Sequence, residues 1–475
     1  MARQACAVLG ILLLAQVAAA QFTQQGNKLV GTGAVNPADQ GGAVAISADG
    51  STAIVGGYSD NSNVGAAWVF TRSGGVWTQQ GSKLVGTGAV GAAMQGVGAA
   101  ISADGNTAVV GGITDNDKTG AVWVYTRSGG VWSQQGSKLA GTGAVPTTYQ
   151  GWATAISADG NTIIVGGYAD NLSTGAAWVF IRSGGVWTQQ GNKLVGAGAV
   201  APSLQGQSVA ISADGNTAII GGNTDNSNTG AAWVYTRSGG VWTQQGNKLI
   251  GTGAVGAGRQ GSSVAISADG NTALVGGNGD SSNVGAAWVF TRSSGVWTQQ
   301  GGKLVGTGAV GNSVQGSAVA ISGDGNTAIV GGYGDNSNFG ATWVFTRSGG
   351  AWTQLGSKLV GTGAVGNAYQ GTRVAISTDG STVIVAGHHD NSNAGAAWVF
   401  AGSSSIGWVP VAAHNPGLKG SQWRSDLGLL NTSTVAVIDP ELTNPMLLRY
   451  EAFSVSPARY ALCPAPSPSL GASTG

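Results

Sequence analysis

Short apolar runs rich in β-branched residues recur along the chain, and each is bounded by a polar or glycine-containing turn. Residues 44–47 and 52–55 flank the dipeptide Asp49-Gly50, which favours a tight hairpin because glycine accepts a positive φ at little cost. Residues 66–72 and 76–80 flank Ser73-Gly74-Gly75 in the same way. No stretch has the 3.6-residue apolar period of an amphipathic helix. The pattern predicts two consecutive hairpins, whose strands we name A, B, C and D.

The pair of hairpins repeats at a fixed interval. Trp68 on strand C is followed by Trp123, 55 residues later, and the spacing is kept in every copy. The strand C series is Trp68, Trp123, Trp178, Trp233, Trp288, Trp343 and Trp398, and the strand D series is Phe22, Trp77, Trp132, Trp187, Trp242, Trp297 and Trp352. Four antiparallel strands per repeat are typical of a propeller blade. The sequence therefore predicts an all-β protein, a seven-bladed β-propeller of 55-residue, four-stranded repeats over residues 21–402.

The two ends of the repeat region complement each other. Residues 21–29 resemble a strand D with no A, B or C before it, and the last copy supplies A, B and C over residues 371–400. We therefore expect the N-terminal strand to complete the last blade, since closure removes exposed sheet edges. Trp408 lies in a competing segment, but Pro410 makes that segment the poorer strand because proline lacks the N–H that a ladder needs.

The regions outside the repeats differ in composition. Arg3, an apolar run over residues 5–14 and Ala18-Ala19-Ala20 predict a signal peptide at residues 1–20. The mature chain is then secreted, either extracellular or periplasmic, with no membrane span after cleavage. We expect a partial β-sandwich-like segment at residues 403–450 and a disordered tail rich in Pro and Ser at residues 451–475.

The amino-acid composition disfavours several functional classes. Of 475 residues 85 are Gly, while the net charge is only +1, which disfavours nucleic acid and anionic membranes as partners. The propeller region contains no Glu and its His residues are His388 and His389, so it offers little for acid–base catalysis. We predict no catalytic residues, no cofactor and a monomer.

The residues of one blade resemble a known repeat. Gln260-Gly-Ser-Ser-Val-Ala-Ile-Ser-Ala-Asp-Gly270, followed by Leu274-Val-Gly-Gly277, resembles the FG-GAP repeat of integrin-α-like β-propellers of the secreted bacterial type. Gln40 and its equivalents replace the phenylalanine of that family. The family's calcium loop is also not matched, because the AB turn at residues 48–51 offers one carboxylate and calcium needs six to eight oxygens. We predict no metal site.

Several repeated residues have structural interpretations. We expect the Trp68 series in the core and the Trp77 series, on the outermost strand, partly exposed. The segment Gly86-Thr-Gly-Ala-Val-Gly91 matches a nucleotide-binding pattern but precedes a strand, so we interpret it as a flexible connector between blades. Asp60-Asn61 predicts an Asx turn. The repeated Lys and Arg residues, Lys28, Lys83, Arg72, Arg127 and their equivalents, predict a solvated positive rim.

Differences between copies point to one face. The DA and BC connectors vary between copies, whereas the AB and CD turns are nearly identical. Up-and-down topology places the DA and BC connectors on one face, which we call the variable face, and the two turns on the opposite, constant face. Loops on a rigid scaffold often carry binding residues. The candidate ligand-binding residues on the variable face are Tyr58, Tyr149, Tyr168, Tyr333, Tyr369, His388 and His389.

The predicted function is a secreted or cell-surface, non-enzymatic binding or adhesion module. Its variable face would take a protein or a glycan, and the sequence leaves both open. The alternatives are a polysaccharide-degrading propeller enzyme, which would need a carboxylate or His cluster near the central channel, and a purely structural surface protein.

Overall fold

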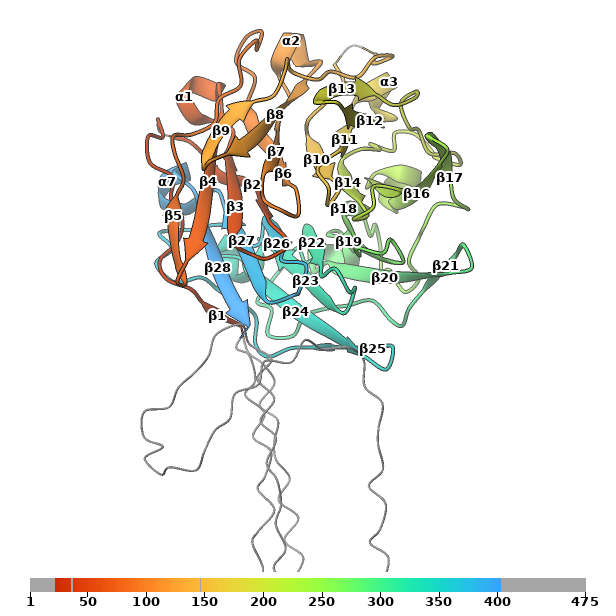
Figure 1. Cartoon of the computed structure of the whole chain (residues 1–475). Helices are drawn as coiled ribbons and strands as arrows, with labels where there is room; N and C mark the ends of the chain where they lie inside the picture. The colour runs from red at the N-terminus through yellow and green to blue at the C-terminus, as the bar shows by residue number, and fades with distance from the viewer. Residues whose placement is uncertain (1–21, 36, 146, 403–475) are drawn as a thin grey trace, which may run out of the picture. The chain divides into compact units, whose positions relative to one another are not determined.

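The computed structural model describes residues 22–402 except residues 36 and 146. In this region seven four-stranded antiparallel sheets follow one another around a central axis (Figure 1). The predicted seven-bladed propeller is therefore confirmed. The predicted signal peptide at residues 1–20 and the segments 403–450 and 451–475 lie outside the described residues.

The blades repeat one strand order, with strand A innermost and strand D outermost. Strands A are β2 (Gln40–Ile46), β6 (Gln95–Ile101), β10 (Ala153–Ile156), β14 (Ser208–Ile211), β18 (Gln260–Ile266), β22 (Ala318–Ile321) and β26 (Arg373–Ile376). Strands B are β3 (Thr52–Gly57), β7 (Thr107–Gly112), β11 (Thr162–Gly167), β15 (Thr217–Gly222), β19 (Thr272–Gly277), β23 (Thr327–Gly332) and β27 (Thr382–Gly387). Strands C are β4 (Ala66–Ser73), β8 (Ala121–Ser128), β12 (Ala176–Ser183), β16 (Ala231–Ser238), β20 (Ala286–Ser293), β24 (Ala341–Ser348) and β28 (Ala396–Gly402). Strands D are β5 (Val76–Gln79), β9 (Val131–Gln134), β13 (Val186–Gln189), β17 (Val241–Gln244), β21 (Val296–Gln299), β25 (Ala351–Gln354) and β1 (Phe22–Gln24).

Each BC connector contains a single four-residue helical turn. In the first, Asn61 and Ser62 have φ values of 50° and 57°, so the turn includes left-handed backbone rather than a regular α-helix. The seven turns are α1 (Asp60–Asn63), α2 (Asp115–Lys118), α3 (Asp170–Ser173), α4 (Asp225–Asn228), α5 (Asp280–Asn283), α6 (Asp335–Asn338) and α7 (Asp390–Asn393). These short polar turns were not expected from the sequence, because they have no apolar period.

The N-terminal strand closes the ring. Strand β1 pairs antiparallel with β28, with Thr23 opposite Ala401 and Gln24 opposite Phe400. Further along, Leu29 forms an isolated bridge with Ala397. The seventh blade thus has the order β1-β28-β27-β26, as predicted from the unmatched strand D.

The strand C tryptophans form the core. Trp68 has no exposed surface, and its indole N–H donates to the carbonyl of Thr32 at 2.8 Å. A Cβ on Gly31 would lie 2.1 Å from the indole, so only glycine allows the connector to cross the ring this closely. All seven residues of the Trp68 series are fully buried, which confirms the predicted core, while Trp77 on strand D is half-buried as expected.

The constant face is held by a closed ring of backbone hydrogen bonds. The amide of Ala48 in the first AB turn donates to the carbonyl of Ala103 in the next turn, at 3.0 Å. The same contact continues blade by blade until Thr378 donates to Ala48, also at 3.0 Å. Since each AB turn is bonded to both neighbours, its backbone is fixed by the assembly of the ring.

The arginines near the constant face are not a solvated rim. Arg127 donates to Gln80 of the preceding blade at 3.0 Å and lies over the ring of Trp132, 5.3 Å from its centroid. The Trp132 indole N–H donates to the same Gln80 oxygen at 3.0 Å. The predicted solvated positive rim is therefore wrong for the arginines, because each guanidinium is used to join two blades.

Candidate ligand-binding site

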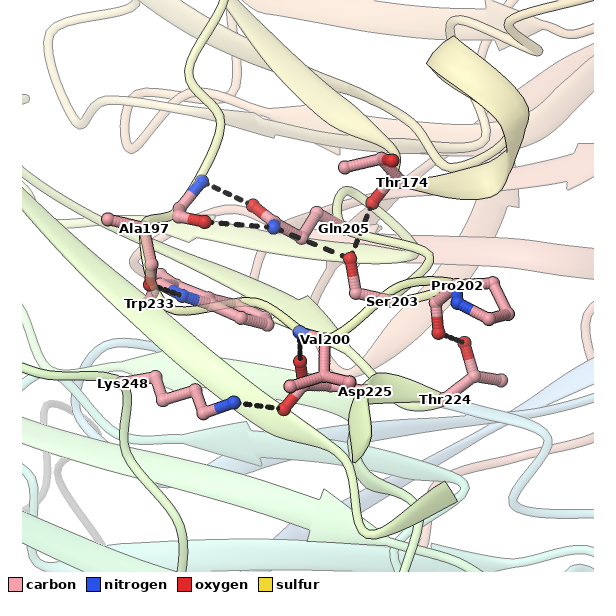
Figure 2. A network of polar contacts seen from close by, with 11 residues as sticks. Thr174, Ala197, Val200, Pro202, Ser203, Gln205, Thr224, Asp225, Trp233 and Lys248 are labelled. Atoms are coloured by element: carbon pink, nitrogen blue, oxygen red, sulfur yellow. Dashed lines mark hydrogen bonds and ion pairs between the residues drawn. The ribbon is translucent and has the colours of Figure 1, made fainter. Parts of the chain in front are cut away.

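The DA connectors are fixed by buried polar side chains. Figure 2 shows this network in the fourth blade, where the side-chain oxygen of Gln205 accepts from the amide of Gly196 at 2.5 Å. The indole of Trp233 donates to the carbonyl of Ala197 at 2.9 Å. The prediction that this connector is flexible is wrong, because in every blade a Gln and a Trp side chain form hydrogen bonds with its backbone amide and carbonyl groups. The glutamine at this position of each repeat, Gln40 and its equivalents, thus has a defined structural role.

A buried carboxylate joins the two connectors that flank each blade. Asp225 accepts from the amide of Val200 in the incoming connector at 2.7 Å and pairs with Lys248 of the outgoing connector at 2.5 Å (Figure 2). Asp60 and Lys83 repeat this arrangement in the first blade. The predicted Asx turn at Asp60 is therefore wrong, because its buried carboxylate bonds to Val35 and Lys83 instead. The prediction that the lysines are solvated is also wrong, because each lysine is largely buried beside its aspartate.

The structure brings five of the candidate residues together on the variable face. They come from three successive blades across the ring closure, and we call them the His388 cluster: Tyr58, Tyr333, Tyr369, His388 and His389. The rings of Tyr369 and His389 are 4.3 Å apart between centroids, and those of Tyr58 and His388 are 6.4 Å apart. All five side chains are partly exposed.

The other two candidates form a separate group on the third blade. Tyr149 and Tyr168 stack with centroids 5.3 Å apart and planes 6° from parallel. Trp152 meets Tyr168 edge-on at 5.0 Å. We call these three residues the Tyr168 cluster.

Two adjoining cavities connect the clusters. The central channel, about 300 Å³, is lined by strand A residues of all seven blades, with hydroxyls and amides such as Ser208, Ser263 and Gln207 among them. A second cavity of about 250 Å³ lies at its mouth, between Tyr58 and His388 of one cluster and Trp152 of the other. Arg373 and Thr372 line both cavities.

Burial is the main influence on the pKa values at the channel mouth, and neighbouring charges modify it. Burial, with the nearby His389 and Arg373, lowers the pKa of His388 to about 3, so this imidazole is neutral at pH 7. Burial and the Asp39 carboxylate raise the pKa of Tyr58 to about 12, so its hydroxyl keeps its proton. The Asp39 carboxylate accepts a hydrogen bond from the Ser59 hydroxyl, and its own pKa is raised by burial.

Arg373 and Trp152 were not among the sequence candidates. Both lie at the start of a strand A, which the comparison of connectors did not include. The residues equivalent to Arg373 in the other blades are all small: Ala43, Gly98, Ala153, Ser208, Ser263 and Ala318. Comparing this strand position between copies would have revealed the single arginine.

Comparisons with known proteins gave no matching family model and no matching curated protein. The class established for this chain is a seven-bladed β-propeller of four-stranded blades. Within the part of the chain that the structure describes, no helix is long and apolar enough to cross a membrane. The same residues contain no group of three His, Cys, Asp or Glu side chains placed to hold a metal ion.

Proposed function

We propose that this chain is a secreted or cell-surface, non-enzymatic binding module of the FG-GAP type, which presents its variable face to a glycan or a protein. The observation that carries the proposal is the convergence of non-repeated side chains on the channel mouth. Residues that differ between copies, such as Tyr58, Trp152, Arg373 and His388, line one cavity there. Aromatic side chains around a concave site with a few polar groups are typical of ligand binding.

The structural constraints differ between the two faces. The AB turns are fixed by their ring of backbone hydrogen bonds, which accounts for their uniformity. On the variable face the framework that repeats in every blade, the Asp60–Lys83 pair and its equivalents, is largely buried. The varying side chains are thus displayed on a fixed backbone, and such preorganisation favours affinity.

The lining of the two cavities favours binding over catalysis. Among the described residues it includes His388 and Arg373 and no carboxylate. General acid–base chemistry usually needs two titratable groups with different pKa values near the reacting atoms. A neutral imidazole beside a guanidinium is better suited to holding a ligand.

Array binding tests this proposal. The mature chain is applied to glycan and protein arrays beside a variant with alanine at Tyr149, Tyr168, Tyr333 and Tyr369. We expect specific binding by the parent chain and a loss of about tenfold or more in the variant, since aromatic residues dominate binding energy. The matched control places serine at the exposed valines 76, 131, 186 and 241, which lie next to the CD turns of the constant face. Binding that survives the tyrosine changes and is lost in the control would contradict the proposal.

A further inference from the structure

Arg373 is the least satisfied charged side chain at the channel mouth. Its single hydrogen bond to the described residues runs from Nη1 to the carbonyl of Thr372 at 2.9 Å. No carboxylate in the described part of the chain lies within ion-pair distance of it, in contrast to the seven lysines that pair with buried aspartates. Arg373 is partly buried at the wall of both cavities, and a charge held there without a protein partner is available to pair with an anionic ligand.

The surroundings of Arg373 are suited to an anion on a ring-shaped, hydroxylated body. Tyr58 and Trp152 provide aromatic faces, while Ile113 and Val97 provide aliphatic surface. In the adjoining channel the hydroxyls of Ser208 and Ser263 donate to the carbonyls of Gly261 and Gly316 at 2.9 Å, which leaves their oxygens able to accept hydrogen bonds. Guanidinium groups bind planar carboxylates through two parallel hydrogen bonds, and polar atoms at the channel wall can bind hydroxyls.

We infer that the channel mouth binds an acidic sugar residue, whose carboxylate pairs with Arg373 and whose ring lies between Tyr58 and Trp152. This inference rests on the proposed binding function and names its ligand class. The cavity of about 250 Å³ is small for a ligand site and fits one such residue, for example the end of a uronic-acid chain. An acidic side chain of a protein could also reach Arg373, but it would leave the aromatic walls and the channel hydroxyls unused.

The charges near Arg373 are compatible with this assignment. The Asp39 carboxylate lies near Tyr58 and His389 of the cluster, and it accepts a hydrogen bond from Ser59 and forms no ion pair with Arg373. His389 lies behind His388, with ring centroids 4.3 Å apart, and adds no negative charge. Tyr333 lines the central channel together with Arg373, and Tyr58 lines the second cavity with it.

A matched pair of sugars tests the inference. D-galacturonate and D-galactose differ in whether C6 is a carboxylate, so calorimetric titration of both into the full chain isolates the anionic contact. We expect galacturonate to bind at least about tenfold more tightly, and Arg373→Gln to abolish that preference. Arg373→Lys should retain part of it. Arg259→Gln, an exposed arginine in a DA connector of the same face, should leave it unchanged.

Further measurements distinguish a failure of the acidic-sugar assignment from a failure of the proposed binding function. Each variant is first melted, and Arg373→Gln should melt at or above the parent temperature because it removes an unpaired charge. An equal affinity for both sugars in the parent chain, or an unchanged preference in Arg373→Gln, overturns the inference. Tighter binding of the peptide acetyl-Asp-Asp-amide than of galacturonate would assign the site to acidic protein segments and also overturns it. If array binding remains sensitive to the tyrosine changes in these cases, the proposed function stands while the acidic-sugar assignment fails.

Discussion

Lys83 Nζ lies 2.5 Å from a carboxylate oxygen of Asp60, and the aspartate side chain is 1% exposed. The other oxygen of Asp60 accepts from the amide of Val35 at 2.6 Å. One carboxylate therefore joins the connector that enters the blade to the connector that leaves it. The variable face depends on this buried pair for its shape.

Breaking the pair should destabilise the blade. Asp60→Ala leaves the Lys83 ammonium and the Val35 amide without their partner, and we expect a loss of about 3 kcal/mol in the free energy of unfolding. Urea denaturation followed by tryptophan fluorescence measures it. Asp117→Asn, at an exposed aspartate in the equivalent turn of the next blade, is the control and should change stability by less than about 0.5 kcal/mol, because asparagine tolerates the left-handed φ of 54° at this position. Equal effects of the two substitutions would contradict the role given to Asp60.

Ring closure should depend on the N-terminal strand. Deleting residues 21–30 removes Phe22 and Leu29 from the core and exposes the edge of β28, so we expect oligomers and a lower melting temperature. Truncation after residue 402 should leave a monomer that melts normally, because the edge of β28 is already paired with β1. Size-exclusion chromatography and thermal melts distinguish the two. A monomeric N-terminal deletion beside an opened C-terminal truncation would place the closure at Trp408 instead.

His388 should make stability depend on pH. Its pKa falls from 6.5 in the unfolded chain to about 3 in the fold, because burial disfavours the imidazolium. The unfolded state therefore binds more protons between these values, so the stabilisation is complete above pH 6.5 and is lost as the pH falls toward 3. His388→Asn, which installs the residue of Asn223 and Asn278, should flatten the melting temperature between pH 6.5 and 4. Asp39, whose pKa is raised, acts in the opposite direction and is common to both proteins. An unchanged slope in His388→Asn would show that another group is responsible.

The melting temperature should not depend on calcium. In the AB turn the carboxylate of Asp49 accepts from the hydroxyls of Ser47 and Ser51 at 2.5 and 2.6 Å. Burial alone would raise the pKa of Asp49, but these hydrogen bonds outweigh burial and hold the pKa below its usual value. We expect melts with and without chelator to coincide. A drop on adding chelator that calcium reverses would contradict this interpretation of the turns.

The fold could be predicted from the sequence because the sequence repeats. The spacing of the Trp68 series and the unmatched strand at Phe22 were sufficient to predict seven blades and their closure, since both are local patterns that seven copies reinforce. The Asp60–Lys83 pair was missed because its residues are 23 positions apart and each looks like an ordinary surface charge. Both the aspartate and the lysine recur in every copy, and this shared recurrence could have indicated that they form a pair.

The candidate site was predictable only in part. Tyr58, Tyr369 and His388 stand out because they vary in connectors that the topology places on one face. Their meeting with Trp152 and Arg373 depends on which side chains of strand A point into the channel, and this follows from the twist and bulges of each blade rather than from any local pattern.

The central claim is that ligands bind the variable face around the channel mouth. Hydrogen exchange of the full chain, measured by mass spectrometry with and without the tightest ligand from the arrays, tests it most directly, since the connectors differ enough in sequence to give distinct peptides. We predict slower exchange in the DA and BC connectors that carry Tyr58, Tyr149, Tyr369 and His388, and no change in the AB and CD turns. Protection confined to the AB and CD turns would contradict the account and place binding on the constant face.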